Sequence, residues 1–409
     1  MARGATAGAN YCDALALGER GRRRKAPGVL YRKLGKNGPE VSVLGFGAMR
    51  LPVIGGRADA IDEVLATQMI RDAVDAGVNY VDTAFPYHGN SLSEPGRSEG
   101  AVGRALADGY RERVHLATKL PSWMIKTRAD MDRYLEGQLE RLGTDHIDCY
   151  LLHSLNEVYW ENLESLGVTQ FLDAALADGR IRYAGFSYHH DLPTFKRVVD
   201  SYDWTFCQIQ YNLLDVDYQA GERGLRYACA RGLGVIVMEP LKGGRLAGRV
   251  PDDVAAAWVS AEANRTPAEW ALRWVWNDAD VSMLLSGMST PEQLAENLQV
   301  ADEGVADSLT AEELDLVERV RDIYRSRIVA DCTACRYCLP CPAGVDIPGC
   351  IRQLNNASLY DDVESARRGY SQIAVKASAC TQCGSCEERC PQGIPIPDVL
   401  QEAAELFGE

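Results

Sequence analysis

The sequence Val81-Asp82-Thr83-Ala84-Phe85-Pro86-Tyr87 places a carboxylate and a phenol five residues apart, where a short apolar segment gives way to a loop. Two more polar residues occur at comparable points, since Lys119 ends the apolar segment 114–119 and His153 ends the segment 147–153. In a parallel β/α barrel the carboxyl ends of all strands open onto one face, so side chains at these ends converge. The pattern therefore predicts one shared site for Asp82, Tyr87, Lys119 and His153.

Apolar strand patterns alternate with helical patterns along most of the chain. The expected strands are 44–47, 78–82, 114–119, 147–153, 181–186, 206–209, 235–238 and 281–285. Eight strand–helix pairs predict an α/β fold of the (β/α)8 barrel type, with a doubly wound parallel sheet as the alternative. Residues 29–33 and 40–43 flank a Gly-Pro turn, which predicts a hairpin across the bottom of the barrel. We expect loops at 88–97 and 154–168 to shape the substrate site.

The four polar residues suit carbonyl reduction. A Tyr hydroxyl is a weak acid, and the nearby ammonium of Lys119 would ease loss of its proton. Asp82 would hold Lys119 charged and in place, and His153 would donate a hydrogen bond to the carbonyl oxygen. Taken singly, such residues have structural explanations, because a strand-end Asp is more often a helix cap and a lone Lys is more often a solvated charge. In type, order and spacing, however, the four resemble the catalytic tetrad of the aldo-keto reductases, and the resemblance covers about residues 29 to 300.

This resemblance implies a substrate that is a small carbonyl compound or alcohol, and NADP(H) or NAD(H) as coenzyme, held across the barrel mouth. The residues that match coenzyme contacts of the family are Gly47, Ser187, Gln208, Met238, Pro240, Leu241, Gly243, Gly244, Ser289, Gln293, Glu296 and Asn297. Tyr188 stands where the family often has Asn. Gly243 and Gly244 have an alternative explanation as a plain turn of the chain. The segment around Ser289 lacks the cation that a 2′-phosphate favours, so the choice between NADPH and NADH stays open.

Composition and charge narrow the class of protein. The chain has 409 residues, enough for a barrel and a further domain, and 46% of them are apolar. A formal net charge of -15 argues against nucleic acid and anionic membranes as partners. The sequence shows neither a secretion signal nor an apolar run of spanning length, which predicts a cytoplasmic protein. Residues 1–28 are basic and are expected to form a flexible tail.

Nine of the thirteen cysteines follow residue 331, in two motifs that each end in Cys-Pro. The first comprises Cys332, Cys335, Cys338 and Cys341; the second comprises Cys380, Cys383, Cys386 and Cys390. The first motif is one residue short before its Pro, so Cys350 is an alternative to Cys341. Closely spaced triplets of this kind bind [4Fe–4S] clusters, and the Cys before Pro reaches the other cluster. We therefore expect two clusters in a mainly helical, ferredoxin-like domain, 331–409. Zinc is the competing metal, but it requires no third closely spaced cysteine.

The expected division of the chain is a tail at 1–28, a barrel at 29–309, a linking helix at 310–330 and the cluster domain at 331–409. A subgroup of aldo-keto reductase-like proteins carries such a tail, and the chain resembles it. A hydride carries two electrons and each cluster accepts one, so direct exchange normally requires a one-electron carrier such as a flavin. No flavin motif is recognisable. Three roles stay open: the clusters exchange electrons with a ferredoxin-like partner, a flavin or radical step occurs in the barrel, or the clusters only hold the domain together. The alternative function for the whole chain is an electron-transfer protein whose barrel binds a redox cofactor or partner.

Overall fold

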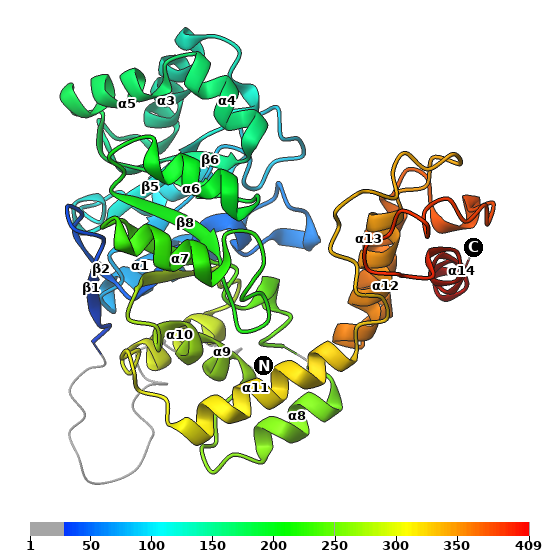
Figure 1. Ribbon diagram of the computed structural model, residues 1–409. Coiled ribbons are helices and arrows are strands. Elements are labelled where there is room, and N and C mark those ends of the chain that lie inside the picture. The colour runs from blue at the N-terminus through cyan, green and yellow to red at the C-terminus, as the bar shows by residue number, and fades with distance from the viewer. Residues whose placement is uncertain (1–27, 249, 409) are drawn as a thin grey trace, which may run out of the picture.

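The computed structural model describes residues 28–248 and 250–408, and its main body is a closed barrel of eight parallel strands (Figure 1). The strands run in the order β10-β3-β4-β5-β6-β7-β8-β9, and β10 pairs with β3 to close the ring. Their bounds are β3 Leu44–Gly47, β4 Tyr80–Asp82, β5 His115–Leu120, β6 Ile147–Leu155, β7 Ile181–Tyr188, β8 Phe206–Gln210, β9 Gly234–Met238 and β10 Val281–Ser286. The predicted barrel is thus confirmed over the doubly wound sheet.

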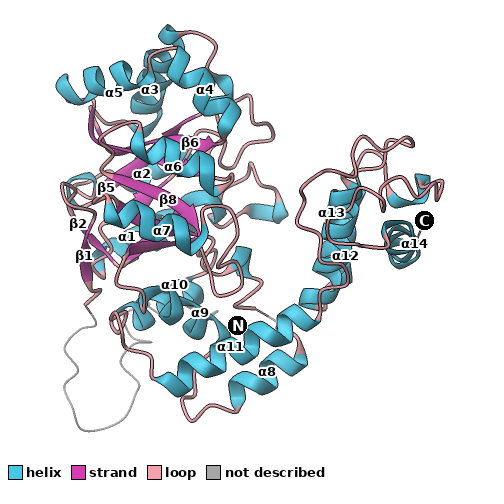
Figure 2. Ribbon diagram, viewed as in Figure 1, coloured by secondary structure: helices cyan, strands magenta, loops and turns pink. Residues whose placement is uncertain are grey.

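Helices cover the outside of the barrel (Figure 2). They are α1 Glu63–Asp75, α2 Ser98–Ala105, α3 Arg128–Leu142, α4 Glu157–Ser165, α5 Val168–Ala177, α6 Leu192–Asp200, α7 Gly221–Ala230, α8 Asp252–Val259, α9 Pro267–Trp276, α10 Pro291–Ala301 and α11 Ala311–Ser326. Helix α3 shows how the sequence sets such boundaries. Thr127 and Asp130 form a capping box at its start, and Gly143 ends it in the left-handed conformation, with φ of 64°.

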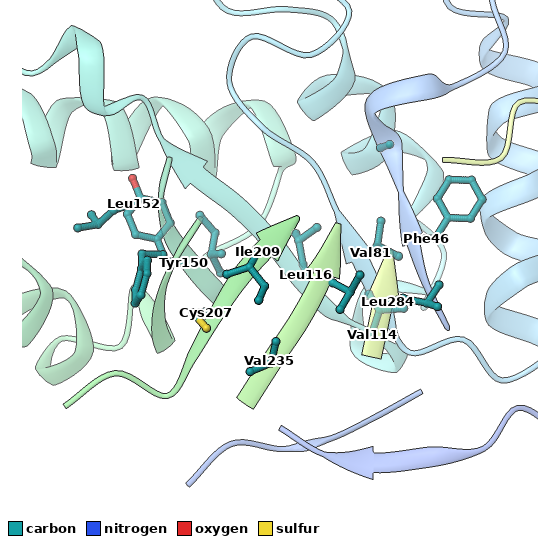
Figure 3. Close-up of a cluster of buried hydrophobic side chains, with 14 of the residues drawn as sticks. Phe46, Val81, Val114, Leu116, Tyr150, Leu152, Cys207, Ile209, Val235 and Leu284 are labelled. Atoms are coloured by element: carbon teal, nitrogen blue, oxygen red, sulfur yellow. The ribbon is translucent and has the colours of Figure 1, made fainter. Parts of the chain in front are cut away.

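Two apolar layers hold the barrel together. Side chains that point outward from the strands, including Val81, Leu116 and Ile209, pack against the helices (Figure 3). Side chains that point inward, including Tyr80, Phe206 and Met283, fill the centre. The predicted hairpin is formed by β1 Tyr31–Lys33 and β2 Glu40–Ser42. Because both layers are packed, the barrel interior is filled, and the loops after the strand ends are where this fold usually binds a ligand.

The C-terminal region is helical, as predicted, and contains α12 Ile347–Tyr360, α13 Val363–Ser371 and α14 Ile396–Phe407. It has its own apolar core, to which Ile351, Leu354 and Leu400 contribute. In Figure 2 the arrows of β6 and β8 point toward the side on which these helices lie. The cluster domain therefore stands next to the mouth of the barrel.

The junction between the two parts is packed. Helix α11 lies along α8, and Tyr360 at the end of α12 joins their apolar cluster. Arg327 donates to the carbonyl oxygen of Ser358 at 3.3 Å and pairs with Asp253 at 3.1 Å. The expected linking helix, 310–330, thus packs against helix α8 of the barrel domain as well as connecting the two domains. The tail expected at 1–28 lies, apart from Gly28, outside the described residues.

Two helices differ from the expectations. Residues 154–168 were expected to be a loop, but β6 runs to Leu155 and α4 follows, capped by the side chain of Asn156. Helix α8 was also unexpected; it forms in the connection between β9 and α9. Both helices are short, with nine and eight residues, and short amphipathic stretches give weak periodic signals. Among helices of the described segments, none combines the length and apolar character that a bilayer crossing requires.

Candidate active site and cluster sites

The structure brings the four predicted polar residues together at the barrel mouth. Asp82 is the last residue of β4, Lys119 lies in β5, His153 lies in β6, and Tyr87 lies in the loop after β4. Lys119 Nζ donates to Asp82 Oδ1 at 2.6 Å, to the carbonyl oxygen of Thr83 at 2.8 Å and to the hydroxyl of Tyr87 at 3.3 Å. These bonds employ all three donors of the ammonium group.

Lys119 and Asp82 form a buried ion pair, with relative exposures of 0% and 2%. Burial lowers the pKa of Lys119, but Asp82 and Tyr87 more than offset this and raise it above 10.5. Burial raises the pKa of Asp82, and Lys119 opposes the rise. The 2.6 Å contact favours the charged pair, because either charge alone would be left unpaired in the interior. The remaining oxygen, Asp82 Oδ2, has no hydrogen-bond partner among the described residues.

Tyr87 is half-buried, and its acidity differs from the simple expectation. Desolvation in the mouth raises its pKa above 10.0, while Lys119 acts in the opposite direction, as predicted from the sequence. The carboxylate of Asp82 and that of Glu239 add to the rise. Tyr87 is therefore a protonated phenol over the physiological range, able to donate its proton rather than to start as phenolate.

His153 is neutral in this setting. Burial lowers its pKa well below 6.5, and the charges of Lys119 and His189 lower it further. Its ring lies 6.1 Å from the ring of Tyr87 and 5.1 Å from that of Trp123, measured between centroids. His153 Nδ1 is buried without a hydrogen-bond partner in the described part of the chain. A neutral imidazole carries one N–H, so the ring offers one donor to an oxygen in the mouth.

A pocket of about 470 Å³ opens beside these residues and contains most of the predicted coenzyme contacts. Its lining includes Gly47, Gln208, Met238, Pro240, Leu241, Gly243, Gly244, Ser289, Gln293, Glu296 and Asn297, together with Asp82, Tyr87 and His153. This volume lies in the usual range for a small-molecule site. The structure therefore places three of the four tetrad residues and eleven of the twelve expected coenzyme positions around one space.

Ser187 is not among the residues that line this pocket. It is 1% exposed, and its hydroxyl oxygen accepts a hydrogen bond from the backbone N–H of Ser154 at 2.8 Å. Tyr188 points away as well, because its hydroxyl donates to the carbonyl oxygen of Asp191. Gln208 does reach the pocket; its Nε2 lies 3.6 Å from Met238 Sδ, and its Oε1 is buried without a partner among the described residues.

The residues at the far end of the pocket already have partners within the chain. Ser289 donates from its hydroxyl to the carbonyl oxygen of Arg50, and its N–H donates to Gln293 Oε1. Asn297 Nδ2 donates to Ser286 at 2.7 Å, and Glu296 accepts from Thr266 at 2.6 Å. Ser289 is thus fixed by its neighbours, which limits what its hydroxyl can offer to a bound phosphate.

Three titratable residues of the pocket lining were not predicted as site residues: Arg50, Glu239 and His189. Arg50 is the only Lys or Arg in the lining of this pocket within the described part of the chain. A Cβ atom at Gly243 would lie 2.9 Å from its Nη2, which places the guanidinium directly over the Gly243 turn. Arg50 follows the first barrel strand by three residues, so the strand-end rule would have found it. Glu239 has a φ of 58°, a conformation that no local sequence signal announces.

The cysteines of the C-terminal region line two small cavities. One is lined by Cys332, Cys335, Cys338 and Cys390, and the other by Cys338, Cys341, Cys380, Cys383 and Cys386. From the sequence, the Cys before Pro of each motif is expected to lie beside the triplet of the other motif. The cavities agree with this, because Cys390 lies with the first triplet and Cys341 with the second. Among the described residues no three His, Cys, Asp or Glu side chains converge tightly enough for a single ion.

Comparison with known families identifies the two parts. Residues 43–321 match the model described as "Aldo/keto reductase family". The chain belongs to the aldo/keto reductase family. Residues 331–394 match the model described as "4Fe-4S dicluster domain", so this aldo/keto reductase carries a C-terminal iron–sulfur domain, as predicted.

Relatives support the same assignment. The chain is 27% identical over 311 residues to "Uncharacterized oxidoreductase YrpG" of Bacillus subtilis, a match that covers 66% of this chain and 91% of that protein. It is 26% identical over 343 residues to "Probable aldo-keto reductase 1" of Glycine max, covering 75% of this chain and 91% of the plant protein. Both matches extend over nearly the full length of the relatives.

Solved structures agree. The holo form of "aldo-keto reductase AKR11C1" from Bacillus halodurans aligns with a TM-score of 0.59 and 27% identity, covering 71% of this chain and 96% of that one. A putative aldo-keto reductase from Pseudomonas aeruginosa, PA4992, aligns with a TM-score of 0.54 and 26% identity, covering 69% and 98%. The protein is an oxidoreductase of this family. These matches favour this function over the alternative, an electron-transfer protein whose barrel only binds a redox cofactor or partner.

Proposed function

We propose that this aldo/keto reductase interconverts an aldehyde or ketone and the corresponding alcohol, with NADPH or NADH as coenzyme. The observation that carries the proposal is the chain of contacts from Asp82 through Lys119 to the Tyr87 hydroxyl, at the edge of the 470 Å³ pocket. A bound nicotinamide supplies the hydride. The residues of the chain then need only to bind the carbonyl oxygen and to give it a proton.

Each residue has a distinct role in this proposal. Tyr87, protonated at neutral pH, donates its proton to the carbonyl oxygen as negative charge develops there. Lys119 stabilises the phenolate that remains, and Asp82 keeps Lys119 charged and in place. The neutral His153 donates a hydrogen bond to the same oxygen and orients the substrate. Carbon gains the hydride and oxygen gains the proton, so the product is the alcohol, and solvent reprotonates Tyr87.

The pocket fits a nicotinamide dinucleotide at two points. The unpartnered Oε1 of Gln208 offers an acceptor for the carboxamide N–H₂. The Gly243 turn and the guanidinium of Arg50 suit phosphate, because glycine lets the backbone approach and arginine forms paired hydrogen bonds. With Ser289 occupied and Arg50 as the single cation in the lining within the described residues, we expect little discrimination between NADPH and NADH.

For the C-terminal domain we propose two [4Fe–4S] clusters held by the eight cysteines, a grouping supported by the two cavities that these cysteines line. These clusters either pass electrons to a ferredoxin-like partner or stabilise the fold of the domain. Neither role requires a flavin. We further propose the division of the chain at residues 29, 310 and 331, and a cytoplasmic location. The reducing environment of that compartment keeps thiolates available for iron.

The test is substrate-dependent oxidation of NADPH and of NADH by the purified protein with a panel of simple aldehydes, using wild type and Tyr87→Phe. The variant lacks the transferable proton, so turnover should fall by about 10³-fold while coenzyme affinity stays within about twofold. A variant that retains wild-type turnover would refute the role of Tyr87. An exposed control, Tyr337→Phe, should behave as wild type.

A further inference from the structure

A second cleft, of about 440 Å³, lies where the cluster domain meets the barrel mouth. Its lining comprises Arg50, Gln210, Glu239, Lys242, Gly243 and Arg245 of the barrel and Ser365 of α13 in the cluster domain. Arg50, Glu239 and Gly243 also line the coenzyme pocket, so the two spaces share a wall. Whatever occupies the pocket beside Gly243 therefore faces the cluster domain.

The cleft carries an excess of positive charge. Lys242 is neutralised, because its Nζ lies 2.6 and 2.5 Å from the two carboxylate oxygens of Asp215. Within the described residues no carboxylate forms an ion pair with Arg50 or with Arg245, which leaves two guanidinium groups against the single carboxylate of Glu239. Two guanidinium groups without a carboxylate partner, in a cleft that also contains a glycine turn, favour a phosphate or another polyvalent anion.

Arg245 is held in place by the cluster domain. Its guanidinium carbon lies 4.7 Å from the ring centroid of Tyr360, the last residue of α12. Tyr360 is 6% exposed and packs with Trp258 of α8 and Tyr324 of α11. Burial and the charge of Asp215 raise its pKa, so the ring stays neutral and attracts the cation through its face. The position of Arg245 thus depends on the docking of α12.

We propose that the cluster domain completes the coenzyme site: Tyr360 positions Arg245 so that its guanidinium, together with that of Arg50, binds the phosphates of the dinucleotide. This inference rests on the dinucleotide use proposed above. Arg245 and Arg50 are then phosphate ligands, and Tyr360 is a positioning residue that touches no ligand itself. The iron–sulfur domain contributes to coenzyme affinity even where no electron passes between cluster and coenzyme.

The experiment is a calorimetric titration, in which the full-length, cluster-loaded protein is titrated with NADP+ and, separately, with NAD+. Arg245→Ala removes one guanidinium–phosphate contact and should weaken binding about tenfold. Tyr360→Ala frees Arg245 and should weaken binding less, whereas Tyr360→Phe keeps the aromatic face and should stay within about twofold. Arg223→Ala, an exposed arginine on the outer helix α7, changes the net charge equally and should leave affinity unchanged.

Salt separates a direct contact from a structural effect. If Arg245 contacts phosphate, the difference between wild type and Arg245→Ala shrinks as salt screens the contact. The inference would be overturned if the Arg245→Ala and Tyr360→Ala variants both bound NADP+ with an affinity within twofold of the wild-type value. Arg245→Ala is the decisive variant if Tyr360→Ala does not fold. A wild-type protein that binds neither nucleotide would refute the dinucleotide function itself, whereas wild-type binding with unaffected variants refutes only the role of Arg245 and Tyr360.

Discussion

The barrel mouth and the cluster domain treat their reactive side chains in opposite ways. In the mouth, Lys119 and Asp82 are almost completely buried and satisfy each other within the polypeptide. In the cluster domain, Cys335 and Cys383 are exposed, and the motif cysteines line cavities that their own side chains do not fill. The barrel thus holds its proposed chemistry in preformed contacts of the chain. The cluster domain is organised around groups that the protein must acquire.

The first prediction breaks the preformed contacts. Lys119→Met leaves Asp82 buried without its partner and removes the stabilisation of the Tyr87 phenolate. Turnover should fall by about 10²–10⁴-fold, and the free energy of unfolding should drop by about 3–5 kcal/mol. Steady-state kinetics and urea unfolding measure the two effects. Lys126→Met, at an exposed lysine, is the control, and a Lys119→Met protein with wild-type turnover would contradict the proposed site.

The second prediction concerns the acquired groups. Cys386→Ser removes one expected cluster ligand, so bound iron should fall by about half and residues 331–409 should become sensitive to protease. The barrel has its own apolar core and should keep its fold. Cys229→Ser, at a cysteine of α7 that donates to the carbonyl oxygen of Asp280, should keep its full iron content. Full iron in Cys386→Ser would show that Cys386 is not a ligand.

The third and smallest effect is the dependence on pH. The pKa of His153 lies well below 6.5, so the ring stays neutral in the folded protein while an unfolded histidine gains a proton below 6.5. Stability from this burial is therefore present above pH 6.5 and is lost as pH falls toward the folded pKa. Because the pKa of Tyr87 lies above 10.0, the rate of carbonyl reduction should be level between about pH 6.5 and 10. A rate that rises or falls tenfold within this interval would contradict these protonation states.

The same contrast explains what the sequence could predict. The tetrad was visible because three polar residues follow apolar strand segments, and the strand ends of a barrel share one face. The cysteine grouping was visible because ligand spacing is a local property. Arg50 follows the same strand-end pattern, three residues after β3, whereas the family resemblance points to the segment around Ser289 for phosphate binding.

Other features depend on contacts that no local pattern encodes. Ser187 matches the family by position, yet the backbone of Ser154 occupies its hydroxyl oxygen and keeps it out of the pocket lining. The positive φ of Glu239 follows from the tight turn of the loop after β9. The contact between Arg245 and Tyr360 joins residues more than a hundred positions apart, so it required the structure.

The most direct test of the account asks whether hydrogen passes from coenzyme to carbonyl carbon within the barrel. The measurement is a single anaerobic turnover of the cluster-loaded protein with coenzyme deuterated at the hydride position, followed by mass spectrometry of the alcohol. Direct transfer beside Tyr87 predicts deuterium on the former carbonyl carbon and no labelled product with Tyr87→Phe. Alcohol that carries only solvent hydrogen at that carbon would mean that electrons travel through the clusters, and would contradict the proposed site.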